Sequence, residues 1–260
     1  MAALRPLAIM LAGVALVGHA WVADAAKIYR WTDRNGVSHY GDHVPDAPPA
    51  EVEIIRTHAE PSAIARLRLE SDGDRRLAWA DNTLAGPIEV RLRVTRGAID
   101  SDPLLPARAT VAARSSVIVA QLDASQSGDL WLDALPGDPS ARPKDVEYLL
   151  PLQQDAFRID QGYGGSFSHG DAENRYAVDF AAAIGTPVLA AREGVVMQVE
   201  SDFDRAGLKL EKYGGRANLI RILHGDGSMA LYAHLKTEGV LVRVGQRVRA
   251  GQQIGLSGNT

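Results

Sequence analysis

Short apolar runs separated by turn residues recur along most of this chain, and helical periodicity is nearly absent. Between residues 61 and 150 the runs are RLRLE, RLAWA, IEVRLRV, ATVAA, SVIVAQL and DLWLDAL. Alternating or continuous apolar runs bounded by turn residues are typical of β-strands. Their spacing predicts a β-sandwich of the immunoglobulin-like type at residues 61–150. We interpret it as a spacer or recognition module, because it holds no titratable cluster suited to chemistry.

The same pattern continues to the end of the sequence, which we predict to be a third, all-β unit at residues 151–260. Its apolar runs are TPVLAA, GVVMQVE, NLIRILHG, MALYAHL, GVLVRV and QQIGLS. Gly245 and Gly251 are expected to carry the chain round tight corners between strands. The proline-rich segment PGDPSARPKDVEYLLP marks the expected boundary near residue 150.

A small β-hairpin is predicted near the N-terminus, in the run KIYRWTDRNGVSHYGDHVP. Asn35-Gly36 is a strong two-residue turn signal, and Tyr29, Trp31 and Tyr40 would cover a minimal apolar face. The proline-bearing DAPPAE segment is expected to end the hairpin and begin a linker. The unit, at residues 27–60, resembles the exported domain called DUF4124, a resemblance that covers residues 15 to 60 and implies no defined chemistry.

Residues 1–26 have the pattern of a cleavable signal peptide: Arg5, an apolar stretch from Leu7 to Val22, and small residues before Lys27. A membrane anchor is disfavoured, because a spanning helix needs about 20 apolar residues. The sequence contains no cysteine, so disulfides and cysteine acylation are excluded. We expect export to the periplasm of a Gram-negative envelope, without stable membrane insertion after cleavage.

Composition is that of an ordinary globular protein, with 46% hydrophobic and 23% charged residues. The formal net charge is -4, and no clustered basic face is evident. Because binding to nucleic acid depends on neutralising phosphates, we exclude a nucleic-acid partner.

Candidate chemistry centres on His169 and Asp179, in the run SFSHGDAENRYAVDFAAA. An imidazole and a carboxylate that converge can hold zinc. Asp179 is flanked by apolar residues that would bury it, and a metal would compensate its charge. The alternatives remain open: His169 as a solvent-exposed loop histidine, and Asp179 as a turn cap or a partner of Arg175.

The roles of the remaining histidines can be considered one by one. His234 follows an alternating strand, and we expect its side chain on the same face as Tyr232, either packed or catalytic. His224 precedes a Gly-Asp-Gly turn and is interpreted as structural. We expect the remaining histidines of the mature chain to lie on the surface: His39, His43 and His58.

Three blocks, in this order, resemble the LytM/lysostaphin-type zinc metallopeptidases of peptidase family M23: SHGDAENRYAVDFAAAIGTPVLAAREGVV, ANLIRILHGDGSMALYAHL and VRVGQRVRAGQQIGLSGNT. The resemblance covers residues 157 to 260. The interval GDAENRYAV is longer than the family's usual spacing between histidine and aspartate. The resemblance implies an antiparallel β domain of the duplicated hybrid motif type. It also implies that His169 and Asp179 are zinc ligands and that His234 is a catalytic histidine near the scissile carbonyl.

The family's remaining motif, H-x-H, would supply a third zinc ligand and a second catalytic histidine, and it does not occur before Thr260. We therefore expect the 260-residue sequence to be an incomplete peptidase domain, truncated at its C-terminus, that binds zinc weakly and hydrolyses slowly. The implied activity is a zinc endopeptidase that cleaves the peptide cross-links of peptidoglycan. The alternatives are a catalytically inactive regulator that activates cell-wall amidases, and a purely structural envelope protein.

Overall fold

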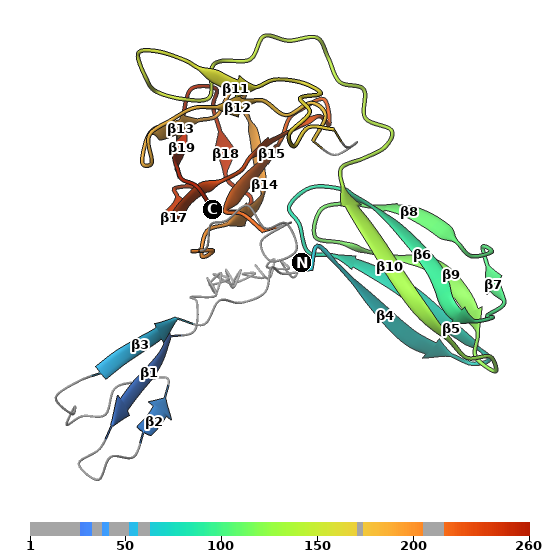
Figure 1. Ribbon diagram of the computed structural model, residues 1–260. Helices are drawn as coiled ribbons and strands as arrows, with labels where there is room; N and C mark the ends of the chain where they lie inside the picture. The colour runs from blue at the N-terminus through green and yellow to red at the C-terminus, as the bar shows by residue number, and fades with distance from the viewer. Residues whose placement is uncertain (1–26, 33–37, 42–51, 57–62, 171–173, 205–215) are drawn as a thin grey trace, which may run out of the picture. The chain divides into compact units, whose positions relative to one another are not determined.

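Figure 1 shows the computed structural model of the chain, which describes residues 27–32, 38–41, 52–56, 63–170, 174–204 and 216–260. Every named element among these residues is a β-strand, and all paired strands run antiparallel, so the predicted all-β class is confirmed. The expected signal peptide lies outside the described residues. Within the described part, no helix is long and apolar enough to cross a membrane. The chain divides into two compact units, Met1–His58 and Ala59–Thr260.

The first unit is a three-stranded sheet of β1 (Lys27–Thr32), β2 (Ser38–Gly41) and β3 (Val52–Arg56), in the order β2-β1-β3. Thr32 pairs with Ser38, which confirms the predicted hairpin, while the predicted Asn35-Gly36 turn lies outside the described residues. The prediction of a linker after the hairpin is wrong in part, because residues 52–56 form strand β3, which pairs along the other edge of β1. Its β-branched residues favour a strand, and β1 offers a free edge for it.

Two antiparallel sheets form the part of the second unit that follows, and their orders are β10-β6-β8 and β4-β5-β9-β7. All six runs predicted as strands contain a strand in the structure, although β8 ends at Val111 and leaves out the last two residues of ATVAA. The additional strand, β7, has two residues and therefore shows no periodicity. The bounds are β4 Ala65–Asp72, β5 Arg75–Asn82, β6 Ile88–Gly97, β7 Ser101–Asp102, β8 Ala107–Val111, β9 Ser116–Asp123 and β10 Gly128–Pro136.

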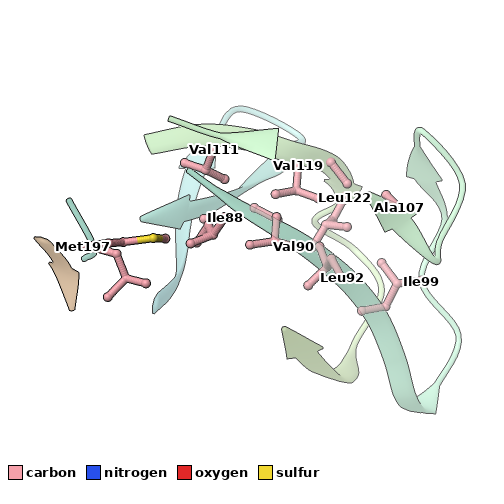
Figure 2. Close-up of a cluster of buried hydrophobic side chains, with 13 residues drawn as sticks. Ile88, Val90, Leu92, Ile99, Ala107, Val111, Val119, Leu122 and Met197 are labelled. Carbon is pink, nitrogen blue, oxygen red and sulfur yellow. The ribbon is translucent and has the colours of Figure 1, made fainter. Parts of the chain in front are cut away.

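Strand β6 shows why these sheets share one core. Ile88, Val90 and Leu92 are fully buried, whereas Arg91 between them is exposed, as expected when successive side chains point to opposite faces. Figure 2 shows this buried cluster, with Met197 at the end away from Ile99. Met197 comes from β14 (Gly194–Glu200), so the sheet of the predicted peptidase region contributes to this core. The division at residue 150 remains a prediction.

The remaining strands form a second core. One sheet has the order β16-β15-β14-β18, a second β13-β19-β17, and β11 and β12 pair with each other. The cluster between them includes Val196, Ile220, Ile222, Leu235 and Ile254. The bounds are β11 Ile159–Gln161, β12 Asp179–Phe180, β13 Pro187–Leu189, β15 Leu219–Leu223, β16 Met229–Tyr232, β17 Leu235–Val240, β18 Arg247–Val248 and β19 Gln253–Ser257.

Gly245 and Gly251 turn corners as predicted, with φ of +87° and +76°. Their amides donate to the carbonyls of Val196 and Ala190, both at 2.8 Å. The strand predicted in GVLVRV, residues 239–244, is misplaced, because the observed strand β17 ends at Val240. β17 starts at Leu235 instead, where it pairs with Ser257 of β19, so register with β19 decides the strand's bounds.

The proline-rich segment after β10 is fixed to the hairpin between β15 and β16. Asp226 Oδ2 accepts from the Lys144 amide and from Arg192 Nη1, each at 2.9 Å. The hydroxyl of Ser228, and after it the Lys144 amide and the Arg192 guanidinium, hold the pKa of Asp226 well below its usual range. Asp226 is therefore ionised at neutral pH and pairs with Arg192 away from solvent.

Candidate metal centre

A tight loop after β11 holds His169 in place. The ring Nδ1 lies 2.9 Å from the Gly162 carbonyl oxygen, and the backbone amide donates to Gly165 O at 3.0 Å. Only 3% of the residue is exposed. The alternative of a solvent-exposed loop histidine is therefore wrong, because the loop folds back over the ring.

Gln161 stabilises the same loop, and sequence reasoning missed it. Its Nε2 donates to Ser168 Oγ at 2.8 Å, and its Oε1 accepts from the Phe167 amide at 3.2 Å. Both contacts lie immediately before His169. A glutamine at the end of a short strand carries no sequence signal for such a role.

Asp179 begins β12 and pairs in register with Gln161 of β11. Its side chain is 49% exposed, so the expected burial is wrong. The alternation of a strand explains the difference: Phe180 packs against the core, and the preceding side chain points the opposite way. The apolar neighbours of Asp179 are thus only partly buried, and the carboxylate between them is half exposed.

The structure brings His169 and Asp179 together, with Nε2 3.2 Å from Oδ1. Two ligands of one tetrahedral zinc, at about 2.0–2.1 Å from the ion, lie roughly 3.3 Å apart. The Gly162 carbonyl accepts a hydrogen bond only if Nδ1 carries the proton, and in the neutral ring this leaves the Nε2 lone pair directed toward Asp179. Both the spacing and the tautomer that this hydrogen bond selects fit a zinc ion. No third His, Cys, Asp or Glu of the described residues joins this pair in a group that could hold a metal.

His234 lies between β16 and β17, where the chain leaves the strand. Its φ is +58°, in the left-handed region, and its backbone carbonyl accepts from the Gly258 amide at 2.9 Å. The predicted shared face with Tyr232 is wrong, because β16 ends at Tyr232. That tyrosine is buried and its hydroxyl accepts from the Ala191 amide at 2.7 Å, whereas His234 is exposed and its Nδ1 contacts the Thr260 carbonyl.

His224 fits its structural interpretation. The residue is buried, its amide donates to Ser228 O across the turn at 2.9 Å, and its Nδ1 lies 2.7 Å from the Glu193 carbonyl. Its ring also meets Tyr148 edge-to-face at 6.0 Å. The side chains of His39, His43 and His58 lie outside the described part of the chain.

Residues 173–260 match peptidase family M23, and residues 15–67 match the domain of unknown function DUF4124, which confirms both resemblances over these segments. The M23 match includes Asp179 and His234 and begins after His169. An 82-residue segment is 43% identical to the peptidoglycan DD-endopeptidase ShyA of Vibrio cholerae, covering 32% of this chain and 16% of that protein. Another, of 103 residues, is 40% identical to the glycyl-glycine endopeptidase ALE-1 of Staphylococcus capitis, covering 38% and 25%. The chain thus spans a quarter or less of these two relatives.

A solved structure described as a zinc containing peptidase from Vibrio cholerae aligns with 90% of this chain and 71% of its own, at 16% identity and a TM-score of 0.32.

Proposed function

We propose that this protein is a zinc metalloendopeptidase that hydrolyses the peptide cross-links of peptidoglycan. The observation that carries the proposal is the 3.2 Å approach of His169 Nε2 to Asp179 Oδ1, since Asp179 lies within the segment that matches family M23 and His169 lies four residues before it. The relatives described as endopeptidases support the substrate class. We further propose export to the periplasm, where such a substrate lies.

His169 and Asp179 would hold the zinc, which when bound supplies Lewis-acid polarisation of a peptide carbonyl and activation of a water. The Gly162 carbonyl keeps the His169 ring in the orientation and tautomer that coordination requires. The half-exposed side of Asp179 leaves the centre open to substrate.

His234 would act on the substrate rather than on the metal. It is exposed, and with Nδ1 against the Thr260 carbonyl its Nε2 is left to exchange a proton or to donate to a developing oxyanion. His234 follows the end of β16 in a left-handed conformation and is exposed, whereas Tyr232 packs in the core.

A catalytic zinc ordinarily has three protein ligands, and the described residues supply two. A third donor would have to come from outside them. With two donors alone we expect weak zinc binding and slow hydrolysis.

A second candidate function is a regulator that has no hydrolytic activity and acts on a cell-wall amidase. The observation that favours it is the same pair of donors without a third among the described residues. Under this alternative, removal of Asp179 would leave the function unchanged.

Digestion of cross-linked peptidoglycan with and without added zinc tests the proposal. We expect slow, zinc-dependent release of cross-link peptides by the wild type, and loss of that release in Asp179→Asn. Asp160→Asn is the matched control, because Asp160 is an exposed carboxylate of the neighbouring strand β11, paired with Arg158. Equal activity of wild type and Asp179→Asn would overturn the zinc-centre assignment. Inactivity of the wild type at every zinc concentration would favour the regulator.

A further inference from the structure

A cavity of about 550 Å³ lies in the second unit, lined by residues of β6, of β7 and of the segment before β8. None of its lining residues belongs to the candidate metal centre. Its volume is within the range of about 300–1,000 Å³ that is usual for pockets that bind small molecules. Two arginines, Arg91 and Arg93, contribute to a wall that is otherwise mostly apolar.

The two guanidinium groups share a single carboxylate. Asp133 Oδ2 accepts from Arg91 Nε and Nη2 at 3.1 and 2.9 Å, and from Arg93 Nε at 3.2 Å. Arg91, and after it Arg93 and Trp131, lower the pKa of Asp133, so this carboxylate is ionised at neutral pH. One negative and two positive charges leave a net charge of +1 at the cavity wall. A ligand with one negative charge would complement this charge. A carboxylate is the expected anion, because a planar guanidinium can bind it through two parallel hydrogen bonds.

The cavity also has an unmet polar requirement. Ser101 is part of its lining, and the Oγ atom is buried with no hydrogen-bond partner in the described part of the chain. A buried hydroxyl without a partner costs about 1–3 kcal/mol. A rotation about the Ser101 Cα–Cβ bond would turn this hydroxyl toward the cavity, where a ligand with hydrogen-bonding groups along its length would supply the missing partner.

Ser101 lies on β7, which is the edge strand of the sheet β4-β5-β9-β7. Edge strands leave backbone groups free on one side, and extended peptides bind to such edges. The remaining lining is apolar and includes Ile99, Leu105 and Leu104, the last of which is 81% exposed at the rim.

We propose that this cavity binds the free C-terminal carboxylate of a short peptide with apolar side chains. The carboxylate pairs with the terminal nitrogens of Arg93, which, unlike its Nε, donate no hydrogen bond to another described residue. The peptide backbone lies along β7, and the apolar side chains contact Leu104 and Leu105. This site is independent of the metal centre, so it stands or fails separately from the proposed hydrolysis.

Isothermal titration of the full chain, in EDTA to prevent cleavage, tests the site. The probes are N-acetylated trialanine with a free carboxylate, the same peptide as its C-terminal amide, and decanoate. We expect saturable binding of the acid peptide and at least tenfold weaker binding of the amide. Equal binding of acid and amide, no saturable binding of the acid at millimolar concentration, or binding of decanoate alone would overturn the proposal.

Arg93→Gln should weaken binding of the acid peptide roughly tenfold or more, because a hydrogen bond to a charged group is lost. The matched control is Arg108→Gln: Arg108 is on the neighbouring strand β8, pairs with Glu89 at 2.8 Å and does not line the cavity. Leu104→Asp should also weaken binding, by repulsion at an exposed position where the fold is not at risk. Wild-type affinity in both Arg93→Gln and Leu104→Asp would contradict the assignment.

Discussion

The Nε2 atom of His169 lies 3.2 Å from Oδ1 of Asp179, although the histidine is buried and the carboxylate is half exposed. The two residues come from different elements, a loop fixed by Gln161 and Gly162 and the start of β12. One member of the pair is held rigidly while the other faces solvent. That combination is what a metal centre requires if a substrate is to reach it.

Gly194 should not tolerate a side chain. A Cβ at this position would lie 2.4 Å from the Leu223 carbonyl oxygen and 2.6 Å from Ile222 Cγ2, because β14 and β15 approach closely there. Gly194→Ala is expected to lower the free energy of unfolding by about 1–3 kcal/mol, measured by urea denaturation. Gly225→Ala is the control, since nothing lies within 4 Å of its Cβ position, and an equal loss in both variants would contradict the argument.

Asn218 should be needed for folding of the C-terminal core. The residue is fully buried, its Oδ1 accepts from the Phe203 amide at 2.9 Å, and its Nδ2 donates to the carbonyls of Phe203 and Leu235 at 2.7 and 3.2 Å. Asn218→Ala leaves the buried Phe203 amide without a partner, while the Phe203 and Leu235 carbonyls still accept from the hydroxyls of Thr237 and Thr260, and the variant is expected to cost about 1–3 kcal/mol. Urea denaturation measures the loss, and a variant within 0.5 kcal/mol of wild type, roughly the effect of a surface substitution, would refute it.

Acid should weaken the link between the proline-rich segment and the β15–β16 hairpin. The Ser228 hydroxyl, then the Lys144 amide and Arg192, lower the folded-state pKa of Asp226. A lowered pKa stabilises the fold above the unfolded-state value, near pH 4, and this stabilisation is lost as pH falls through the folded-state value. Asp226→Asn should therefore be less stable than wild type at pH 7, with a difference that narrows toward pH 2.

Urea denaturation at pH 7, 4 and 2 measures that difference, with Asp160→Asn as an exposed control. A gap between wild type and Asp226→Asn that stays constant over this range would show that ionisation of Asp226 is not what stabilises the contact.

Replacing His234 with glycine should preserve the stability of the fold and abolish hydrolysis. At φ +58° a Cβ is disfavoured, so His234→Gly is expected to be as stable as His234→Ala or up to about 1 kcal/mol more stable. Both variants should lose peptidoglycan hydrolysis, because the imidazole is the proposed catalytic group. Thermal unfolding and the digestion assay check the two parts. Hydrolysis retained in a folded His234→Gly variant would remove His234 from the mechanism.

The strands that alternate over five or more residues could be predicted from the sequence, and β5, β6 and β9 are examples. Their inward side chains form the core, so periodicity and packing agree. β3 and β12 could not be predicted in the same way. A neighbouring proline-rich segment obscured β3, and β12 is only two residues long. Both depend on partner strands that a local pattern does not reveal.

For the candidate site, residue types could be predicted and environments could not. His169 and Asp179 were identified from the sequence, and the structure places them together. The expected burial of Asp179 was wrong, because strand alternation turns its side chain outward, and the alternative of an exposed His169 is excluded by the loop that buries its ring. The backbone of His234 is set by its contacts with Gly258 and by the register of β17, which are interactions distant in sequence.

Zinc binding to the isolated chain tests the central claim most directly. Equilibrium dialysis with zinc raised to saturation should show weak binding of one zinc ion per wild-type chain, at least about tenfold weaker binding by His169→Ala and by Asp179→Ala, and no change in Asp160→Ala. Zinc binding that is the same in wild type and in both ligand variants, or that is absent from the wild type, would contradict the assignment of His169 and Asp179 as the metal centre.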